Sequence, residues 1–191
     1  NVANTVSLTT GTQKNQTYVS VGAVNARGII QNNDLDRYNF SVRNTTSMLN
    51  DKLTMDLSFM YSNVKEQNML SQGEYANPLV PVYLFPRGDD FSKYQYYERY
   101  DVDRNIKTQF WPLKENGLSM QNPYWITNRN MYTNKKDRFL ASGSLKYTIT
   151  DWLNVSGRVK LDKETINSEK KMYASTLNVI AENSDKGAYV Q

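Results

Sequence analysis

The residues best suited to bind a ligand are aromatic side chains near the middle of the chain. An aromatic face can stack on the flat C–H face of a sugar ring, while amide and guanidinium groups bind hydroxyl groups. Eight aromatic residues fall in one stretch: Tyr94, Tyr96, Tyr97, Tyr100, Phe110, Trp111, Tyr124 and Trp125. We predict that a solute is bound by five residues of this region: Trp111, Tyr124, Trp125, Asn128 and Arg129.

The same rings have a simpler interpretation, which we favour. They lie in a predicted connection that spans residues 65–138, and a connection of this length needs a small core of its own. The rings would then pack the connection onto itself or onto a partner protein. The Asn-Pro steps at Asn77-Pro78 and Asn122-Pro123 most simply set turns.

Acidic residues in the same region could hold a metal or catalyse hydrolysis, but neither pattern is complete. Asp101–Asn105 resembles the start of a calcium loop, yet Ile106 stands where the glycine belongs and Pro112 where the final glutamate belongs. Glu98 and Asp101 could pair as glycosidase carboxylates, but nothing fixes the spacing that such a pair needs. We therefore expect no catalytic residue and no metal site.

The absence of two residue types narrows the chemistry further. The chain has no cysteine and no histidine. This removes disulfides, thiolate nucleophiles, and the commonest general base and metal ligand. We expect no enzymatic activity and no cofactor.

Charge and hydropathy exclude further classes of protein. The net charge is +4 with a pI near 9.1, and basic residues alternate with acids instead of forming the stripe that nucleic-acid binding requires. The chain has no apolar run near 18 residues, so no transmembrane helix is expected, and it opens without a signal peptide. A mean hydropathy of −0.70 is usual for soluble proteins, but strands of a membrane barrel also give low values because only alternate residues meet lipid.

The elements that must position these residues are β-strands. From Leu53 to Tyr61 apolar residues occupy one parity and mostly polar residues the other, and Leu153–Leu161 repeats the pattern. Strict alternation predicts strands with one apolar and one polar face. The chain as a whole predicts six strands, near residues 4–10, 16–24, 38–49, 52–64, 139–149 and 152–163.

The connections between these strands differ in length on the two sides. Tight turns near residues 11–15, 50–51 and 150–151 join the strands into three hairpins, whereas the segments 25–37 and 65–138 are longer. Residues from 164 onward begin a third long connection. Short turns at one end and long loops at the other are typical of outer-membrane barrels. A strand of about ten residues, tilted near 45°, spans roughly 23 Å, close to the apolar band of such barrels.

A soluble β-sandwich that binds glycans or mediates adhesion is the alternative, because alternating strands also build sandwiches. The strands here are longer than usual, and their polar faces carry charge. Those charges would line or hydrate a barrel lumen: Arg43, Lys146, Arg158 and Lys160. On a lipid face each would cost about 2–4 kcal/mol at mid-bilayer. We therefore predict an all-β, antiparallel, up-and-down transmembrane barrel segment with one long external loop.

Several short motifs resemble SusC/RagA-type TonB-dependent transporters, in the same order along nearly the whole chain. Each motif is weak by itself, and the shared order and spacing carry the resemblance. The motifs are Gly11–Tyr18 as an early strand entry, Ala26–Ile30 as a short loop, Asn50–Thr54 as a periplasmic turn, Asn77–Leu79, Tyr83–Arg87 and Gln121–Trp125 in the long external loop, and Tyr147–Leu153 as the next turn.

The resemblance implies a role in import across the outer membrane of Bacteroidetes. Members of this family have a 22-stranded barrel with an N-terminal plug, pair with a SusD-like surface lipoprotein, and import oligosaccharides or peptides with energy from TonB. About six strands cannot close such a barrel, and open edges are not tolerated in lipid. We therefore expect residues 1–191 to be part of the barrel, with the plug and the remaining strands absent. The expected partners are lipid, the lipoprotein, the solute and, through other parts of the protein, TonB.

Overall fold

The chain forms two compact units. The computed structural model describes residues 1–70, 73–112 and 120–191. Unit 1 comprises Asn1–Ala26, Leu35–Lys65 and Lys135–Ile166, and unit 2 comprises Arg27–Asp34, Glu66–Asn134 and Asn167–Gln191. Each unit is described by itself below.

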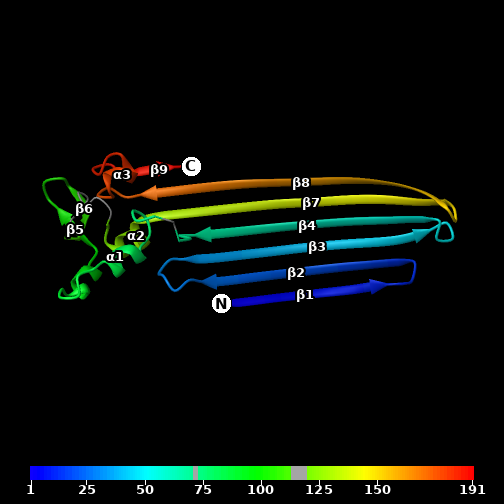
Figure 1. Cartoon of the computed structure of the whole chain (residues 1–191), viewed down its shortest axis with the longest axis horizontal. Helices are drawn as coiled ribbons and strands as arrows, with labels where there is room; N and C mark the ends of the chain where they lie inside the picture. The colour runs from blue at the N-terminus through cyan, green and yellow to red at the C-terminus, as the bar shows by residue number, and fades with distance from the viewer. Residues whose placement is uncertain (71–72, 113–119) are drawn as a thin grey trace. The chain divides into compact units, whose positions relative to one another are not determined.

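A seven-stranded antiparallel sheet contains most of the chain, and its strands follow one another as a meander (Figure 1). The spatial order is β1-β2-β3-β4-β7-β8-β9, which matches the order along the chain once the small hairpin β5–β6 is set aside. The bounds of the seven strands are β1 Val2–Gly11, β2 Asn15–Arg27, β3 Asp34–Met48, β4 Leu53–Gln67, β7 Asn130–Thr150, β8 Leu153–Met172 and β9 Ala188–Val190.

The tight turns of unit 1 use residues that tolerate left-handed backbone. Gly11 closes β1 at φ +146°, and a Cβ there would lie 2.0 Å from the carbonyl oxygen of Asn15, so only glycine fits. Asn50 and Asp51 between β3 and β4 have φ 54° and 64°, values that Asn and Asp adopt more readily than other side chains. From the first turn, β1 and β2 pair without a bulge, with Gly11 opposite Gln16 and Val2 opposite Asn25.

The prediction of an all-β chain built from antiparallel hairpins is confirmed in that coarse form, and strands occupy all six predicted places. The predicted connection 65–138 is wrong in its bounds, because β4 continues to Gln67 and β7 already begins at Asn130. β8 likewise continues to Met172 instead of ending near residue 163. Residues 130–138 are mostly polar on both parities, so alternation disappears there although backbone pairing continues.

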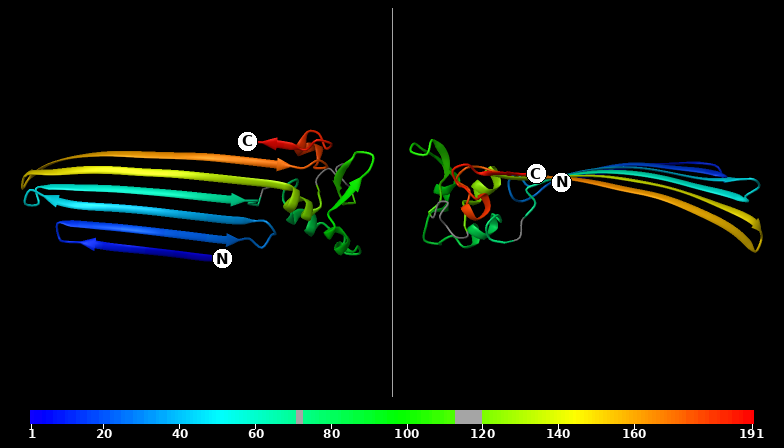
Figure 2. Two further views of the ribbon diagram at one scale, coloured as in Figure 1. Left: turned by 180° about the vertical axis from the view of Figure 1, so that it is seen from behind. Right: turned by 90° about the horizontal axis from the view of Figure 1, so that it is seen from above.

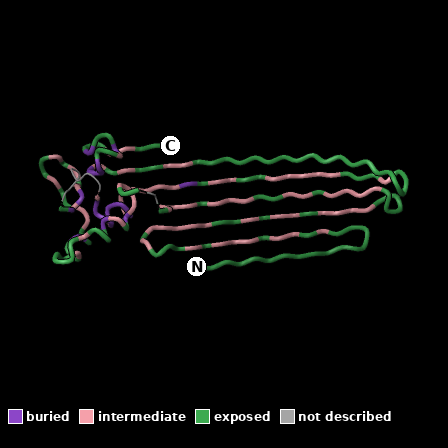
Figure 3. The backbone as a smooth tube through the Cα atoms, viewed as in Figure 1, coloured by how far each residue is buried: buried purple, intermediate pink, exposed green. Residues whose placement is uncertain are grey.

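The part of the sheet in unit 1 is a single layer. Figure 2 shows the long strands edge-on in one of its views, with one layer of backbone. No described residue of unit 1 is buried, and the buried stretch that Figure 3 shows on β7 is Asn134, which belongs to unit 2. Apolar side chains are therefore left open to solvent, with Val155 58% and Val159 77% exposed.

Unit 2 has a core of its own, and short elements surround it. The fully buried side chains include Trp125, Leu177, Gln121, Asn122 and Thr176. Among the described residues, no helix is long and apolar enough to span a bilayer. The short elements are α1 Leu79–Tyr83, the 3₁₀ turn η1 Phe91–Gln95, the hairpin β5 Glu98–Asp101 and β6 Ile106–Gln109, α2 Pro123–Arg129, and α3 Asn178–Ala181.

Candidate functional site

One face of unit 1 carries a continuous apolar surface, which we call the apolar belt. Side chains of four neighbouring strands meet there: Phe40, Val42, Leu57, Phe59, Phe139, Ala141, Val159 and Leu161. The ring of Phe59 lies 6.0 Å from that of Phe40 and 4.8 Å from that of Phe139. At Gly143 a Cβ would come within 3.2 Å of the Leu57 side chain, so glycine leaves room for this close approach.

On β2 and β3 the belt ends in polar side chains near the tight turns. Asn44 continues the belt face of β3, and its Nδ2 donates to Asn15 Oδ1 at 2.9 Å and to Thr17 Oγ1 at 2.8 Å. Thr46 Oγ1 donates to Asn44 Oδ1 at 2.7 Å. These four residues form the turn-end rim, and each of them is neutral. Asn44, which interrupts the apolar parity in the sequence, therefore marks where the belt stops on β3.

A second set of polar side chains ends the belt toward the long connections, and we call it the loop-end rim. On β4 and β7, Tyr61 OH and Asn63 Nδ2 both donate to Asp137 Oδ1, at 2.6 and 2.7 Å. On β2 and β3, Asn25 Nδ2 donates to Asp36 Oδ1 at 2.8 Å. Polar side chains thus end the belt at the loop side, and on β2 and β3 also at the turn side, whereas on β4, β7 and β8 its apolar residues continue to the tight turns.

The opposite face of unit 1 is polar and cross-linked between strands. Arg43 on β3 pairs with Asp56 on β4 at 2.8 Å, and Arg138 on β7 makes two hydrogen bonds to Asp162 on β8, at 3.0 and 2.8 Å. Ser58 and Ser142 meet between them at 2.8 Å. Alternation places Lys146, Arg158 and Lys160 on the same face. The cations predicted to share a polar face therefore do share it.

In unit 2 the predicted aromatic residues pack against one another. Trp111 is 5% exposed, and its ring lies 5.1 Å from Tyr94 and 5.7 Å from Phe85. Trp125 has no exposed surface, and its Nε1 donates to Thr176 Oγ1 at 3.3 Å. Tyr124 is half-buried with its ring 6.0 Å from Phe91. These contacts match the packing interpretation of the cluster, and solute binding at these residues stays a prediction.

The two polar residues of the predicted set are also held by neighbours. Asn128 Nδ2 donates to the Tyr124 carbonyl at 2.8 Å, and its Oδ1 accepts from Asn32 at 3.1 Å. Arg129 makes two hydrogen bonds to Glu98, from Nε at 2.6 Å and Nη2 at 2.8 Å, and its guanidinium lies 4.8 Å from the Tyr173 ring. Arg129 thereby joins α2 to the hairpin β5–β6.

Glu98 is the most strongly engaged carboxylate of this region. Burial raises the pKa of its carboxyl group, but hydrogen bonds from Lys107 and Arg129 outweigh burial, so the pKa lies below its ordinary value. The Lys107 ammonium is 2.7 Å from Glu98 Oε1. Burial lowers the pKa of Arg129, but its hydrogen bonds to Glu98 together with the charges of Glu98, Tyr97 and Tyr173 outweigh burial, so the pKa is raised. The pair is ionised at neutral pH and holds two elements together.

Asp101, the other carboxylate of the proposed pair, closes the β5–β6 turn. Its Oδ1 accepts the backbone N–H groups of Asp103 and Arg104, both at 3.1 Å. This is the local turn bonding that Asp favours. No group of acidic residues in the described part of the chain is arranged to hold a metal ion.

Three buried amide side chains, which sequence reasoning did not select as central, organise unit 2. Asn122 Nδ2 donates to the carbonyls of Tyr94 and Phe110 at 2.8 and 2.9 Å, while its Oδ1 caps α2 by accepting from the Tyr124 N–H at 2.8 Å. Gln109 accepts from Asn122 N, and Gln121 donates to the Tyr75 carbonyl at 2.8 Å. The Asn-Pro step was the available signal, since Asn before Pro at a helix start predicts an N-cap.

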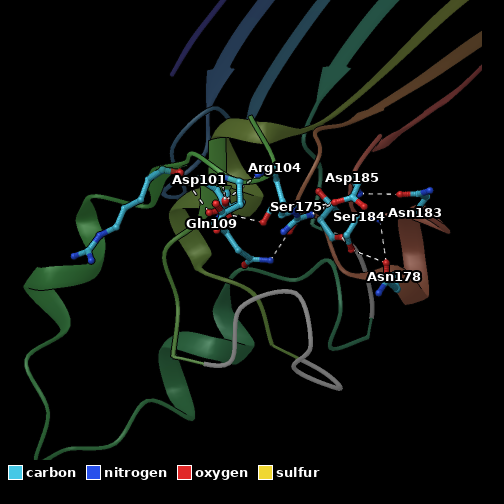
Figure 4. A network of polar contacts seen from close by, with 12 residues as sticks. Asp101, Arg104, Gln109, Ser175, Asn178, Asn183, Ser184 and Asp185 are labelled. Carbon is cyan, nitrogen blue, oxygen red and sulfur yellow. Dashed lines mark hydrogen bonds and ion pairs between the residues drawn. The ribbon is translucent and has the colours of Figure 1, made fainter. Parts of the chain in front are cut away.

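A polar network connects the hairpin β5–β6 to the segment that follows β8 (Figure 4). Gln109 donates from its backbone N–H to Ser175 Oγ at 2.9 Å and from Nε2 to the Ser175 carbonyl at 2.7 Å. Arg104 pairs with Asp185 at 2.6 Å. Within the segment, Ser184 Oγ donates to the Thr176 carbonyl at 2.8 Å. Within unit 2, these bonds hold the hairpin β5–β6 against the segment that follows β8.

Unit 2 also contains a cavity of about 490 Å³. Its described lining is mostly aliphatic and thioether, with Met69, Met131, Met172 and Ile180 among the residues, and Lys170 is the one charged residue among the described lining residues. The Lys170 ammonium lies 5.4 Å from the Tyr132 ring. A lining of this kind suits an apolar group better than a sugar, which needs several hydrogen-bonding partners.

Neither the family models nor the curated proteins give a match to this chain.

Proposed function

We propose that this chain forms part of the wall and one external loop of an outer-membrane importer. In this account the apolar belt faces lipid and the polar face of unit 1 faces a watery lumen. Unit 2 forms the external surface structure. The transporter would belong to the SusC/RagA type that the sequence motifs resemble, and strands outside residues 1–191 would close the barrel.

The observation that carries the proposal is the open apolar belt, with polar side chains at its loop end and, on β2 and β3, at its turn end. Side chains such as Leu57 and Val159 are 46% and 77% exposed, although they share a face with other apolar residues. Contiguous apolar surface of this kind marks contact with a membrane or another protein. The belt side of β7 runs from Phe139 to Ile149, which rises about 33 Å and spans roughly 23 Å when tilted near 45°. The apolar band of outer-membrane barrels is about 25 Å tall.

The remaining parts of the proposal follow from the class of transporter. The solute would be an oligosaccharide or a peptide, a SusD-like lipoprotein would cover the external side, and TonB would act through parts outside this chain. No covalent chemistry is assigned to these residues. The charges of Arg43, Lys146 and Arg158 would hydrate the lumen or contact the plug.

Fractionation of cells that express the full-length protein tests this function. The proposal predicts that the protein stays in the outer-membrane pellet after washing with high salt and alkaline carbonate, and leaves it only with detergent. A soluble sandwich module would be released without detergent, and that result would overturn the proposal.

A further inference from the structure

Three lysines lie on the belt face of unit 1, just past the loop-end rim or beside it. Lys65 follows Tyr61 and Asn63 on β4, Lys135 comes before Asp137 on β7, and Lys163 follows Leu161 on β8. Each is separated from its belt neighbours by an even number of residues, so its side chain leaves the same face of the sheet. All three are exposed.

Two of these lysines face each other across neighbouring strands. The Thr148 N–H donates to the Lys52 carbonyl at 2.8 Å, and Ser58 meets Ser142 in the same register. Counting along β4 and β7 from these pairs sets Lys65 directly opposite Lys135. Like charges in this position destabilise a sheet unless something of opposite charge lies between them.

Asp137, two residues from Lys135 on the same face, supplies part of that opposite charge and interacts electrostatically with Lys135. None of the three lysines makes an ion pair or a hydrogen bond with another described residue. The nearest carboxylate on this face, Asp137, accepts hydrogen bonds from Tyr61 and Asn63. The turn-end rim, by contrast, consists of neutral amides and hydroxyls. The turn-end rim on the belt face is therefore uncharged, whereas at the loop end the three lysines stand beside two carboxylates, Asp36 and Asp137, and leave a net positive charge.

We propose that Lys65, Lys135 and Lys163 bind the phosphate groups of anionic lipid in the outer leaflet. This inference rests on the proposed function, because it needs the belt to lie in lipid. Acyl chains packed on the belt would bring their headgroups to the height of these ammonium groups. Lysine side chains at such a boundary extend toward the headgroups and gain electrostatic attraction there. A free phosphate would lack the acyl chains that hold a headgroup in place.

Native mass spectrometry of the full-length protein in neutral detergent tests the proposal. Lipid A is titrated as the probe, with phosphatidylcholine and inorganic phosphate in separate arms. The double variant K65Q/K135Q is compared with K146Q/K160Q, which removes two exposed lysines from the opposite face. We expect lipid A to bind K65Q/K135Q more than about tenfold more weakly, the size expected for two lysines near an anionic surface. Binding to K146Q/K160Q should match the unmodified protein.

Three results would overturn the inference: equal lipid A binding by K65Q/K135Q and the unmodified protein, an equal loss in K146Q/K160Q, or inorganic phosphate that displaces lipid A at equal concentration. These outcomes are separate from failure of the proposed function. A protein that leaves the membrane without detergent refutes the importer, whereas a protein that stays in the membrane and binds lipid A independently of these lysines refutes only this inference.

Discussion

At the scale of single residues, the side chains that look most like ligand contacts are part of the core. Trp125 is fully buried and Trp111 nearly so. Sequence shows that Trp and Tyr gather in one segment, but it does not show which ring faces inward, because the segment lacks the alternation that assigns faces in the strands. The local Asn-Pro step predicts the cap that Asn122 provides, but its central place in unit 2 depends on the distant carbonyls of Tyr94 and Phe110, which no local pattern encodes.

Replacing Asn122 with alanine should destabilise unit 2. The variant leaves the Tyr94 and Phe110 carbonyls without this donor and the start of α2 without its cap. The expected loss is about 2–4 kcal/mol in the free energy of unfolding. Thermal unfolding followed by tryptophan fluorescence in the detergent-solubilised full-length protein measures it.

Asn77 supplies the matched control for this change. It also precedes a proline, and its Oδ1 accepts a single bond from the Leu79 N–H at 3.0 Å in an exposed setting. Asn77→Ala should therefore cost no more than about 1 kcal/mol. Equal losses in the two variants would show that Asn122 acts only as a helix cap.

At the scale of elements, alternation predicts where each strand crosses the belt and fails where the belt ends. β7 extends nine residues ahead of its predicted start at residue 139, since Asn130–Arg138 is mostly polar on both parities while its backbone stays paired. The short elements of unit 2 are too brief for periodicity to show, with α2 seven residues long and β5 four. Their positions depend on side-chain bonds such as that of Arg129 to Glu98.

The stability of unit 2 should depend on pH through this bond between α2 and β5. Because the folded pKa of Glu98 lies below its ordinary value of 4.5, the carboxylate stabilises the fold above about pH 4.5. That stability is lost as pH falls from 4.5 through the folded pKa. The temperature at the unfolding midpoint of unit 2 should therefore decrease as the pH is lowered from 4.5 through the folded pKa. In Glu98→Gln this temperature should change less with pH.

Tryptophan fluorescence in a Trp152→Phe background reports this change from unit 2, because among the tryptophans of this chain only Trp111 and Trp125 then remain. Glu182→Gln, at an exposed position, serves as control and should keep the pH dependence of the unmodified protein. A Glu98→Gln variant with an unchanged pH profile would contradict a stabilising role for the ion pair.

At the scale of the whole molecule, the account depends on what lies against each face of the sheet. The antiparallel meander and its two-faced strands follow from sequence, whereas closure into a barrel, which our proposal assigns to strands outside residues 1–191, cannot be read from these residues. Belt, rims and polar face together are consistent with a membrane wall in which hydrocarbon covers only the middle of the strands.

Quenching by brominated lipid tests this claim most directly. This chain has no cysteine, so a single introduced cysteine can carry one fluorescent label. The two variants Val159→Cys and Arg158→Cys place the label at adjacent positions of β8. Each is made in a cysteine-free background of the full-length protein and reconstituted into bilayers. The account predicts strong quenching by lipids brominated on their acyl chains at position 159 and little at position 158. Equal quenching at the two positions, or stronger quenching at 158, would contradict it.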